Sequence, residues 1–509
     1  MRRTTIATRM ASLGILLLVA SSVGADVRLP AVFSDGMILQ QEMPVSVWGK
    51  AEPGEKVAVA LAESKAEATA DATGDWRVKL GPLKADNNAL TLTVQGKNTV
   101  TVRNVLAGEV WIASGQSNMA WTFHMKKVVG PGKDLDLPNL RFFKGRHLIT
   151  EAPQWDTDGR WVACTPDHRT YGEFSATAFF FARELHRSLG VPVGIIDLSW
   201  GGLAIDRFMS RESLASEPEL KTAILDRWEA DRVRRAEREG KQKIEDDFQA
   251  VLKVYEEARA KGEKSQDGRG GGREWNPRIM RQQPSSIFNC VIAPVIHYAI
   301  RGALWWQGEW NADDPLYHKA FTTLIADWRQ RWGQDDFPFL FVQLQREGKF
   351  SSPMIREAFL KTLSLPKTGM AVIIDLPPSL HPREKDIVGH RLKLAADAVA
   401  YGKDVVYSGP LYDSMAVEGD KVRLKFRHVG GGLMAQSGEP LKGFTIAGEN
   451  QKFIEAEAKI DGETVVVAGP QLTKPVAVRY GWAKVPDCNL SNKAGLPASP
   501  FRTDDWLLK

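Results

Sequence analysis

The sequence contains little of what several large protein classes require. Its 509 residues include three cysteines, Cys164, Cys290 and Cys488, and no two of them form the closely spaced CxxC pair of a zinc site. The nine histidines show no HExxH spacing, and the chain has neither a strand-associated GxGxxG sequence nor a Walker motif. These absences predict an activity that uses no metal ion and no cofactor.

Charge of one sign is not concentrated in the chain. Lysine and arginine number 67 against 62 for aspartate and glutamate, and Arg2, Arg3 and Arg9 all precede the first acidic residue. Binding to nucleic acid requires a concentrated basic face, so the composition argues against a nucleic-acid partner. With 43% hydrophobic and 25% charged residues, the composition is that of a globular protein.

Long apolar runs are also missing beyond the first 25 residues. Residues 1–25 combine a basic start, an apolar run from Leu13 to Ala20 and small residues up to Ala25, which is the layout of a secretory signal peptide. That run is shorter than the ~20 residues needed to span a bilayer. We therefore expect cleavage near Ala25, a secreted or periplasmic mature protein and no membrane partner.

The pattern of apolar residues divides the rest of the chain into three regions. Residues 26–107 alternate short apolar runs with turn residues, which predicts an N-terminal β-sandwich-like domain. Residues 108–408 alternate continuous apolar strands with helical patterns, which predicts a parallel sheet covered by helices on both faces. Residues 409–509 return to the β-type pattern. The two β-rich regions pack either as one accessory sandwich or as two.

A charged segment interrupts the α/β region. Residues 212–272 carry many charges and only a thin apolar stripe at helical spacing. Such a narrow stripe favours a solvated helical insertion over a helix that binds a partner.

Polar motifs follow the apolar strands of the α/β region. Ser117 lies in Gly115-Gln116-Ser117-Asn118, directly after a strand, where a tight turn lifts a serine to the carboxyl edge of the sheet. The carboxyl ends of parallel strands share one edge, so we expect further polar segments to meet Ser117 there. These segments are Ser199-Trp200-Gly201-Gly202, Trp305-Trp306-Gln307-Gly308-Glu309-Trp310-Asn311, Arg356-Glu357 and Leu380-His381-Pro382.

Taken together, these motifs show that the sequence resembles the sialate O-acetylesterase family, a branch of the SGNH/GDSL-type hydrolases that act on acetylated carbohydrates. The resemblance covers nearly the whole chain after residue 25, including LPAVFSDGMILQ at residues 29–40 and FRTDDW at residues 501–506. It implies a flavodoxin-like, three-layer α/β/α SGNH hydrolase domain with flanking β-rich regions. It also implies a secreted serine esterase that removes O-acetyl groups from carbohydrates, of the sialate 9-O-acetylesterase type, through an acetyl-serine intermediate.

The resemblance assigns roles to individual residues. The serine of GQSN is the family's nucleophile and the histidine of the HP motif is its base, which gives Ser117 and His381 here. The oxyanion site is implied to consist of the Ser117 N–H, the Gly202 N–H and the Gln307 amide. These roles agree with the chemistry of a nucleophilic hydroxyl, which needs an imidazole to take its proton and donors to hold the oxyanion.

Substrate-binding residues are expected around this centre. Trp121 and Trp310 are candidates for a platform under a sugar ring, and Asn311 lies beside them. A sialic acid carries a carboxylate, so its pocket should present a cation, for which Arg356 is a candidate. Two alternatives stay open at this point: an acetylxylan or other glycan deacetylase on the same scaffold, and a non-catalytic glycan-binding protein.

The acid that orients the histidine is not set by the motifs. SGNH enzymes usually carry an aspartate two or three residues before the catalytic histidine, where this sequence has Pro378 and Ser379. Asp375 is our preferred acid, because a carboxylate on the loop of His381 has the shortest route to the ring. Glu309, at the same sheet edge, is the alternative. In a third case no carboxylate serves, and a backbone carbonyl holds the ring of a Ser-His dyad.

Overall fold

The fold is described from a computed structural model. The structure describes residues 26–507 with the exception of residues 126, 146–149, 240–282, 437 and 439. The predicted signal peptide at residues 1–25 and the second part of the predicted insertion at residues 212–272 lie outside the described residues.

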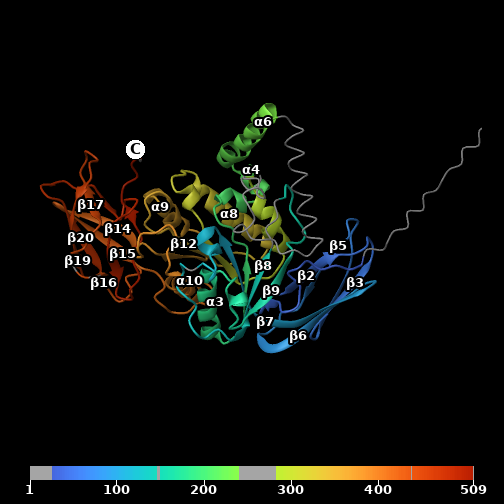
Figure 1. Ribbon diagram of the computed structural model, residues 1–509. Coiled ribbons are helices and arrows are strands. Elements are labelled where there is room, and N and C mark those ends of the chain that lie inside the picture. Colours follow the sequence, from blue (N-terminus) through green and yellow to red (C-terminus); the bar gives the residue numbers. More distant parts are fainter. Residues whose placement is uncertain are drawn as a thin grey trace, which may run out of the picture.

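A mostly parallel sheet forms the centre of the molecule (Figure 1). Its spatial order is β13–β12–β11–β7–β10–β8–β9, and every neighbouring pair is parallel except β8 and β9. The strands are β7 (Thr99–Gly115), β8 (Leu137–Gly145), β9 (Gly159–Cys164), β10 (Val193–Asp197), β11 (Gly302–Trp306), β12 (Phe339–Gln343) and β13 (Thr368–Val372). Without β8 and β9, which extend one edge, the order is the 2-1-3-4-5 of flavodoxin-like folds.

Helices cover both faces of this sheet, which explains why β10, β11 and β12 are buried along their whole length. On one face α3 (Ala176–Leu189) packs closely on α10 (Lys385–Val399), and on the other α8 (Tyr317–Trp332) packs on α9 (Pro353–Thr362) (Figure 1). Ser175 and Ser352 cap the N-termini of α3 and α9, and left-handed glycines end α3 and α8. The predicted three-layer α/β/α fold is confirmed.

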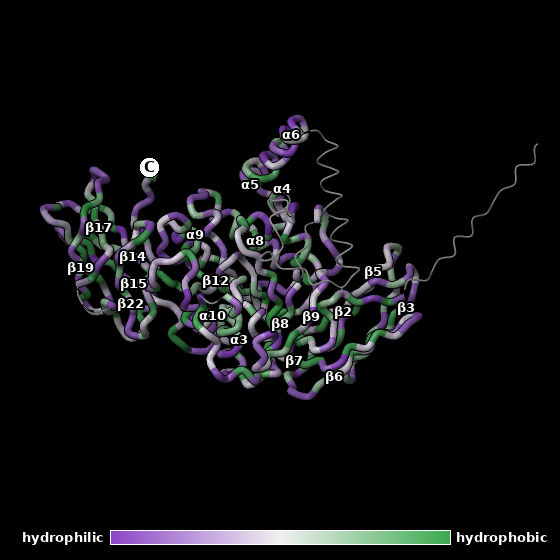
Figure 2. The backbone as a smooth tube through the Cα atoms, in the orientation of Figure 1, coloured by the Kyte–Doolittle hydropathy of each residue, from purple (hydrophilic) through white to green (hydrophobic). Residues whose placement is uncertain are grey.

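Short helical segments connect these elements. They are α1 (Ser117–Ala120), α2 (His168–Tyr171), η1 (Ile205–Phe208), α4 (Arg211–Ser216), α5 (Pro218–Leu220), η2 (Lys221–Asp226), α6 (Arg227–Glu239), η4 (Phe288–Ile292), η5 (Ala293–Val295) and η6 (Glu309–Asn311). The described part of the charged insertion is therefore helical, and α6 projects from the body of the molecule with a mostly hydrophilic surface (Figures 1 and 2). Among the described residues, no helix combines the length and apolarity of a membrane span.

The N-terminal β-rich region shares a strand with the central sheet. Its own strands are β1 (Ile38–Gln40), β2 (Val45–Lys50), β3 (Lys56–Leu61), β4 (Ser64–Thr69), β5 (Asp75–Leu80) and β6 (Asp86–Gln95). The first part of β7 pairs antiparallel with β6, and the part from Glu109 onward pairs parallel with β10 and β11. The expected boundary between residues 107 and 108 thus falls inside one continuous strand.

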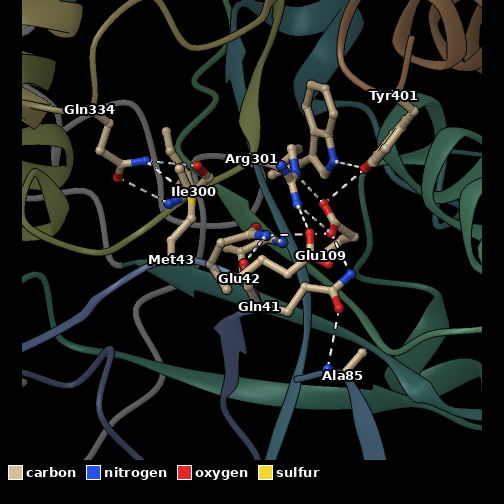
Figure 3. Close-up of polar contacts among 12 residues, drawn as sticks. Gln41, Glu42, Met43, Ala85, Glu109, Ile300, Arg301, Gln334 and Tyr401 are labelled. Carbon is tan, nitrogen blue, oxygen red and sulfur yellow. Dashed lines mark hydrogen bonds and ion pairs between the residues drawn. The ribbon is translucent and has the colours of Figure 1, made fainter. Parts of the chain in front are cut away.

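A buried carboxylate joins the N-terminal region to the α/β region where β7 enters the central sheet (Figure 3). Glu109 accepts hydrogen bonds from Gln41 Nε2 at 2.7 Å, from Arg301 Nε at 2.7 Å and from the Tyr401 hydroxyl at 2.9 Å. Its side chain is 1% exposed. Residues from both regions therefore share one charged centre.

The C-terminal β-rich region lies at the other end of the molecule from the N-terminal one (Figure 1) and has a separate apolar core. One of its sheets contains β14 (Leu411–Glu418), β15 (Lys421–Arg427), β20 (Thr464–Ala468) and β19 (Glu457–Asp461). The other sheet contains β18 (Ile454–Glu455), β17 (Phe444–Ala447), β21 (Ala477–Tyr480) and β23 (Phe501–Arg502), and a short pair joins β16 (Leu433–Ala435) to β22 (Leu490–Asn492). The two β-rich regions therefore form separate units.

Candidate active site

Ser117 lies at the tight turn where β7 gives way to α1. Gly115 has a φ of +123°, and a Cβ atom there would lie 2.2 Å from the carbonyl oxygen of Trp306 on β11. Only glycine fits this close approach of two strands. The N–H of Gln116 donates to the same Trp306 carbonyl at 2.9 Å. This turn makes Ser117 the first residue of α1, at the carboxyl edge of the sheet.

His381 reaches Ser117 from the loop between β13 and α10. Its Nε2 lies 2.9 Å from Ser117 Oγ, and its ring stacks on Trp121 with centroids 4.0 Å apart. Burial, with the nearby ammonium groups of Lys385 and Lys127, lowers the pKa of His381 to about 4. The imidazole is therefore neutral near pH 7, which is the form that accepts a hydroxyl proton.

A glycine pair forms the other side of the nucleophile turn. The N–H of Trp200 donates to the Gly115 carbonyl at 2.9 Å, which ties this loop to the end of β7. A Cβ atom on Gly201 would lie 3.3 Å from both Cα and Cβ of Ser117, and Gly202 has a φ of +75°. The structure thus brings the Gly201 backbone against the nucleophile, with Gly202 next to it in the chain.

The Gln307 amide, expected at the oxyanion site, is held by other partners in the structure. Its Nε2 donates to the Leu203 carbonyl at 3.2 Å and to Asn311 Oδ1 at 2.8 Å, while its Oε1 accepts from the Tyr317 hydroxyl at 3.0 Å. A primary amide has two N–H donors, and both have partners here. Gln307 therefore holds the loop that follows Gly202, through Leu203.

The preferred acid, Asp375, does not meet the imidazole either. Its two carboxylate oxygens accept from Arg391 Nη1 and Nη2 at 2.7 and 2.6 Å. Both side chains are about nine-tenths buried. Asp375 precedes His381 on the loop between β13 and α10, as expected, but its carboxylate binds Arg391 of α10.

Glu309, the alternative acid, contacts the residue after the nucleophile. Its Oε1 accepts from Asn118 Nδ2 at 2.6 Å, and burial raises the pKa of Glu309, a shift that this hydrogen bond opposes. In the described part of the chain, no carboxylate forms an ion pair with His381. Neither of the two candidate acids, Asp375 and Glu309, therefore contacts His381 in this structure.

The expected cation of the substrate pocket is buried in a structural role. Arg356 is fully buried, and its guanidinium donates to Ser351 Oγ at 2.7 Å and to the carbonyl of Ala483 in the C-terminal region. Burial lowers its pKa to about 10. Arg356 thus joins α9 to the C-terminal region and has no exposed surface that a substrate carboxylate could reach.

Of the neighbouring candidates, Trp310 is exposed and Asn311 is not. Trp310 is 56% exposed and packs edge-on against Phe350. Asn311 Oδ1 accepts from Gln307, and its Nδ2 donates to Asp314 at 3.1 Å. Trp310 is therefore available to a ligand, whereas Asn311 supports the loop beneath it.

Sequence reasoning missed three polar residues around this centre: Asn118, Gln345 and Lys385. Asn118 and Lys385 are fully buried, and Gln345 Nε2 donates to the carbonyl of Leu380 at 2.9 Å. For Asn118 and Lys385, the only signal in the sequence is their closeness to the proposed reacting residues: Asn118 follows Ser117, and Lys385 lies four residues after His381.

A three-layer α/β/α fold with a serine against a neutral histidine at the sheet edge is typical of carboxylic ester hydrolases. Residues 270–386 match the family model described as carbohydrate esterase, sialic acid-specific acetylesterase. The chain is 30% identical to sialate O-acetylesterase of Mus musculus over 458 residues, covering 78% of this chain and 79% of that protein. It belongs to the sialate O-acetylesterase family.

Two further relatives extend the likeness over nearly the whole chain. Sialate O-acetylesterase of Homo sapiens is 26% identical, covering 96% of this chain and 95% of that protein. The crystal structure of a carbohydrate acetylesterase from Xanthomonas citri matches with a TM-score of 0.78 at 36% identity, covering 94% of this chain and all of that one. The protein is thus an enzyme that removes O-acetyl groups from carbohydrates, and the alternative of a non-catalytic glycan-binding protein is wrong.

Proposed function

We propose that Ser117 attacks the acetyl carbonyl and that the reaction passes through an acetyl-serine intermediate. The observation that carries this proposal is the 2.9 Å contact between Ser117 Oγ and the neutral imidazole of His381. His381 takes the hydroxyl proton during attack and gives it to the departing sugar oxygen. It then activates the water that releases acetate and restores Ser117.

Backbone groups supply the oxyanion site in this proposal. Ser117 is the first residue of α1, so its N–H has no acceptor within the helix. Gly202 follows Gly201, whose backbone lies against Ser117. Such N–H donors stabilise the charge that develops on the carbonyl oxygen. Gln307 contributes indirectly, because its hydrogen bond to Leu203 supports the loop that presents Gly202.

We propose that the reaction uses a Ser117–His381 dyad. The stacking of Trp121 on the imidazole restricts the tilt of the ring. In a triad, the carboxylate likewise holds the imidazole in its orientation. Trp121 therefore supports the base in this proposal, and Trp310 is left as the aromatic platform for a sugar ring.

The proposed substrates are O-acetylated sialic acids, esterified at the 9-position, because the curated relatives are sialate O-acetylesterases. A neutral acetylated glycan such as acetylxylan is the second candidate, and the burial of Arg356 favours it. Acetate release from 9-O-acetylated sialic acid and from acetylated xylo-oligosaccharides distinguishes the two. Higher kcat/KM on the xylan ester would reject the sialate assignment.

Export is also part of the proposal, and it rests on residues 1–25. Expression of the full chain in a bacterial host should give a mature protein whose N-terminus is Asp26, as measured by mass spectrometry of the extracytoplasmic fraction. Retention of the intact leader in the cytoplasm would contradict it.

The mechanism is tested by Ser117→Ala with p-nitrophenyl acetate as substrate. We expect kcat to fall by at least ~10³-fold with unchanged folding, because loss of the nucleophile leaves only residual binding effects. Acid quench of the wild-type reaction should trap one acetyl group on the peptide that contains Ser117. Wild-type turnover by the variant would show that Ser117 is not the nucleophile.

A further inference from the structure

A buried side-chain amide lies between two oppositely charged groups beside the nucleophile. Asn118 Nδ2 donates to Glu309 Oε1 at 2.6 Å and to the Leu380 carbonyl at 2.9 Å, while its Oδ1 accepts from Lys385 Nζ at 2.6 Å. Asn118 and Lys385 are fully buried, and Glu309 is nearly so. The amide therefore uses both of its N–H groups and its oxygen.

The two charges fix the orientation of this amide. Rotation of the Asn118 amide by half a turn would place its NH2 group against the Lys385 ammonium and its oxygen against Glu309. Burial lowers the pKa of Lys385 to about 7 and raises that of Glu309, and their mutual attraction opposes both shifts. The Lys385 ammonium also lies 4.1 Å from the centre of the Trp306 ring, a cation–π contact that partly replaces its lost hydration.

The amide connects the two groups that are proposed to react. Asn118 is the residue after Ser117, and the Leu380 carbonyl that it holds belongs to the residue before His381. The same carbonyl accepts a second hydrogen bond, from Gln345. A shift of the Asn118 amide would therefore move the backbone of the base relative to that of the nucleophile.

We propose that Lys385 is a positioning residue for the esterase reaction. Through its hydrogen bond to Asn118 Oδ1, it sets the amide that holds the Leu380 carbonyl and so keeps His381 in line with Ser117. This inference rests on the roles proposed for Ser117 and His381. Lys385 has no hydrogen bond to either of them and holds His381 in place through Asn118; its charge also lowers the pKa of His381.

The test compares two lysines on the same helix, α10. Lys385→Met keeps the length and apolar stem of the side chain but removes the hydrogen-bond donor. We expect kcat on p-nitrophenyl acetate to fall by about 10²-fold, the cost of a misplacement near 1 Å, with KM within about threefold of wild type. Labelling of Ser117 by a serine-directed organophosphonate should slow by a similar factor.

Lys393→Met is the matched control. Lys393 Nζ lies 2.5 Å from Asp397 Oδ2, and Asp397 keeps a second cation, Lys403, in the variant. We expect Lys393→Met to keep wild-type kcat and labelling rate. A folded Lys385→Met protein that behaves like this control would overturn the proposal.

A second variant covers the case in which Lys385→Met does not fold. Asn118→Asp keeps an oxygen for Lys385 but removes both N–H donors, so the Leu380 carbonyl loses this partner. We expect slow turnover and slow labelling at unchanged KM, and wild-type values would again overturn the proposal. Ser117→Ala distinguishes failure of the positioning role from failure of the proposed mechanism. If Ser117→Ala is inactive while the Lys385 and Asn118 variants are normal, only the positioning role of Lys385 fails.

Discussion

At the scale of single residues, the proposed chemistry depends on an imidazole that stays neutral. Burial is the largest cause of the lowered pKa of His381, and the ammonium groups of Lys385 and Lys127 add to it. A free histidine has a pKa near 6.5. Between about pH 6.5 and 4, the unfolded chain therefore binds a proton at His381, whereas the folded protein does not. The base should therefore remain competent in mild acid.

We predict that kcat/KM changes little between about pH 6.5 and 5 and falls as the pH drops through about 4, where the imidazole gains its proton. The measurement is a pH–rate profile on p-nitrophenyl acetate. A melting temperature at each pH is the control, because the unfolded chain binds this proton first and stability declines between about pH 6.5 and 4. An acidic limb near 6.5 in fully folded protein would contradict the prediction.

A second prediction concerns Asp375, whose carboxylate pairs with Arg391. Asp375→Asn should lower the free energy of unfolding by about 3–5 kcal/mol, since it leaves a buried guanidinium without its charge partner. At temperatures below the melting transition, kcat should stay close to wild type. Denaturant unfolding and kinetics on the same sample test both parts, and a ~10²-fold loss of kcat at unchanged stability would return Asp375 to the role of orienting acid.

Some site residues could be predicted from the sequence and others could not, because different interactions determine their positions. Ser117 and His381 were predictable because each follows a strand in a local motif. The partners of Asp375, Gln307 and Arg356 were not, because they come from distant segments of the chain. Hydrogen bonds between remote segments leave no pattern in a single sequence.

At the scale of elements, the site depends on loops that approach each other closely at the sheet edge. Continuous apolar runs predicted the central strands correctly. Strands that are buried on both faces carry apolar residues at every position, so they appear in the sequence as unbroken apolar runs. The extent of β7 was not predictable, because alternation gives way to continuous burial within the strand, and two residues inside it, Asn104 and Gly108, are of types common in turns. The close contact of Gly201 with Ser117 likewise arises only when two strand ends meet.

We predict that Gly201→Ala lowers kcat by about 10–10²-fold, because the added methyl group would lie 3.3 Å from Cα and Cβ of Ser117 and push the nucleophile out of line. KM and the melting temperature should change little. Gly81→Ala is a suitable control, since its Cβ would meet only Ser64 Oγ at an ordinary 3.7 Å. Wild-type kcat in Gly201→Ala would show that the turn tolerates a side chain.

At the scale of the whole molecule, two β-rich units flank the α/β core (Figure 1). Buried polar contacts attach both units to the core. The C-terminal unit is held by Arg356 and by Gln343 Nε2, which donates to Ser499 Oγ at 2.8 Å. The N-terminal unit is held by the shared strand β7 and by Glu109 (Figure 3). The β character of both flanks could be predicted from alternation and turn residues, but the separation of the flanks into two units could not, because it depends on contacts made after folding.

The last prediction concerns Glu109, which lies at the amino end of the part of β7 that belongs to the central sheet, while Ser117 follows its carboxyl end. Glu109→Gln should destabilise the protein by about 3 kcal/mol, because Arg301 loses the charge of its buried partner. Activity should be retained below the melting transition, since the site lies at the opposite edge of the sheet. Glu42→Gln is the matched control: Glu42 also faces Arg301, but at 3.5 Å and with a mostly exposed side chain, so its loss should cost at most about 1 kcal/mol. Calorimetry and kinetics on both variants test whether Glu109 contributes to stability and not to activity. A loss of kcat in Glu109→Gln without a loss of stability would show that the two edges of the sheet are coupled.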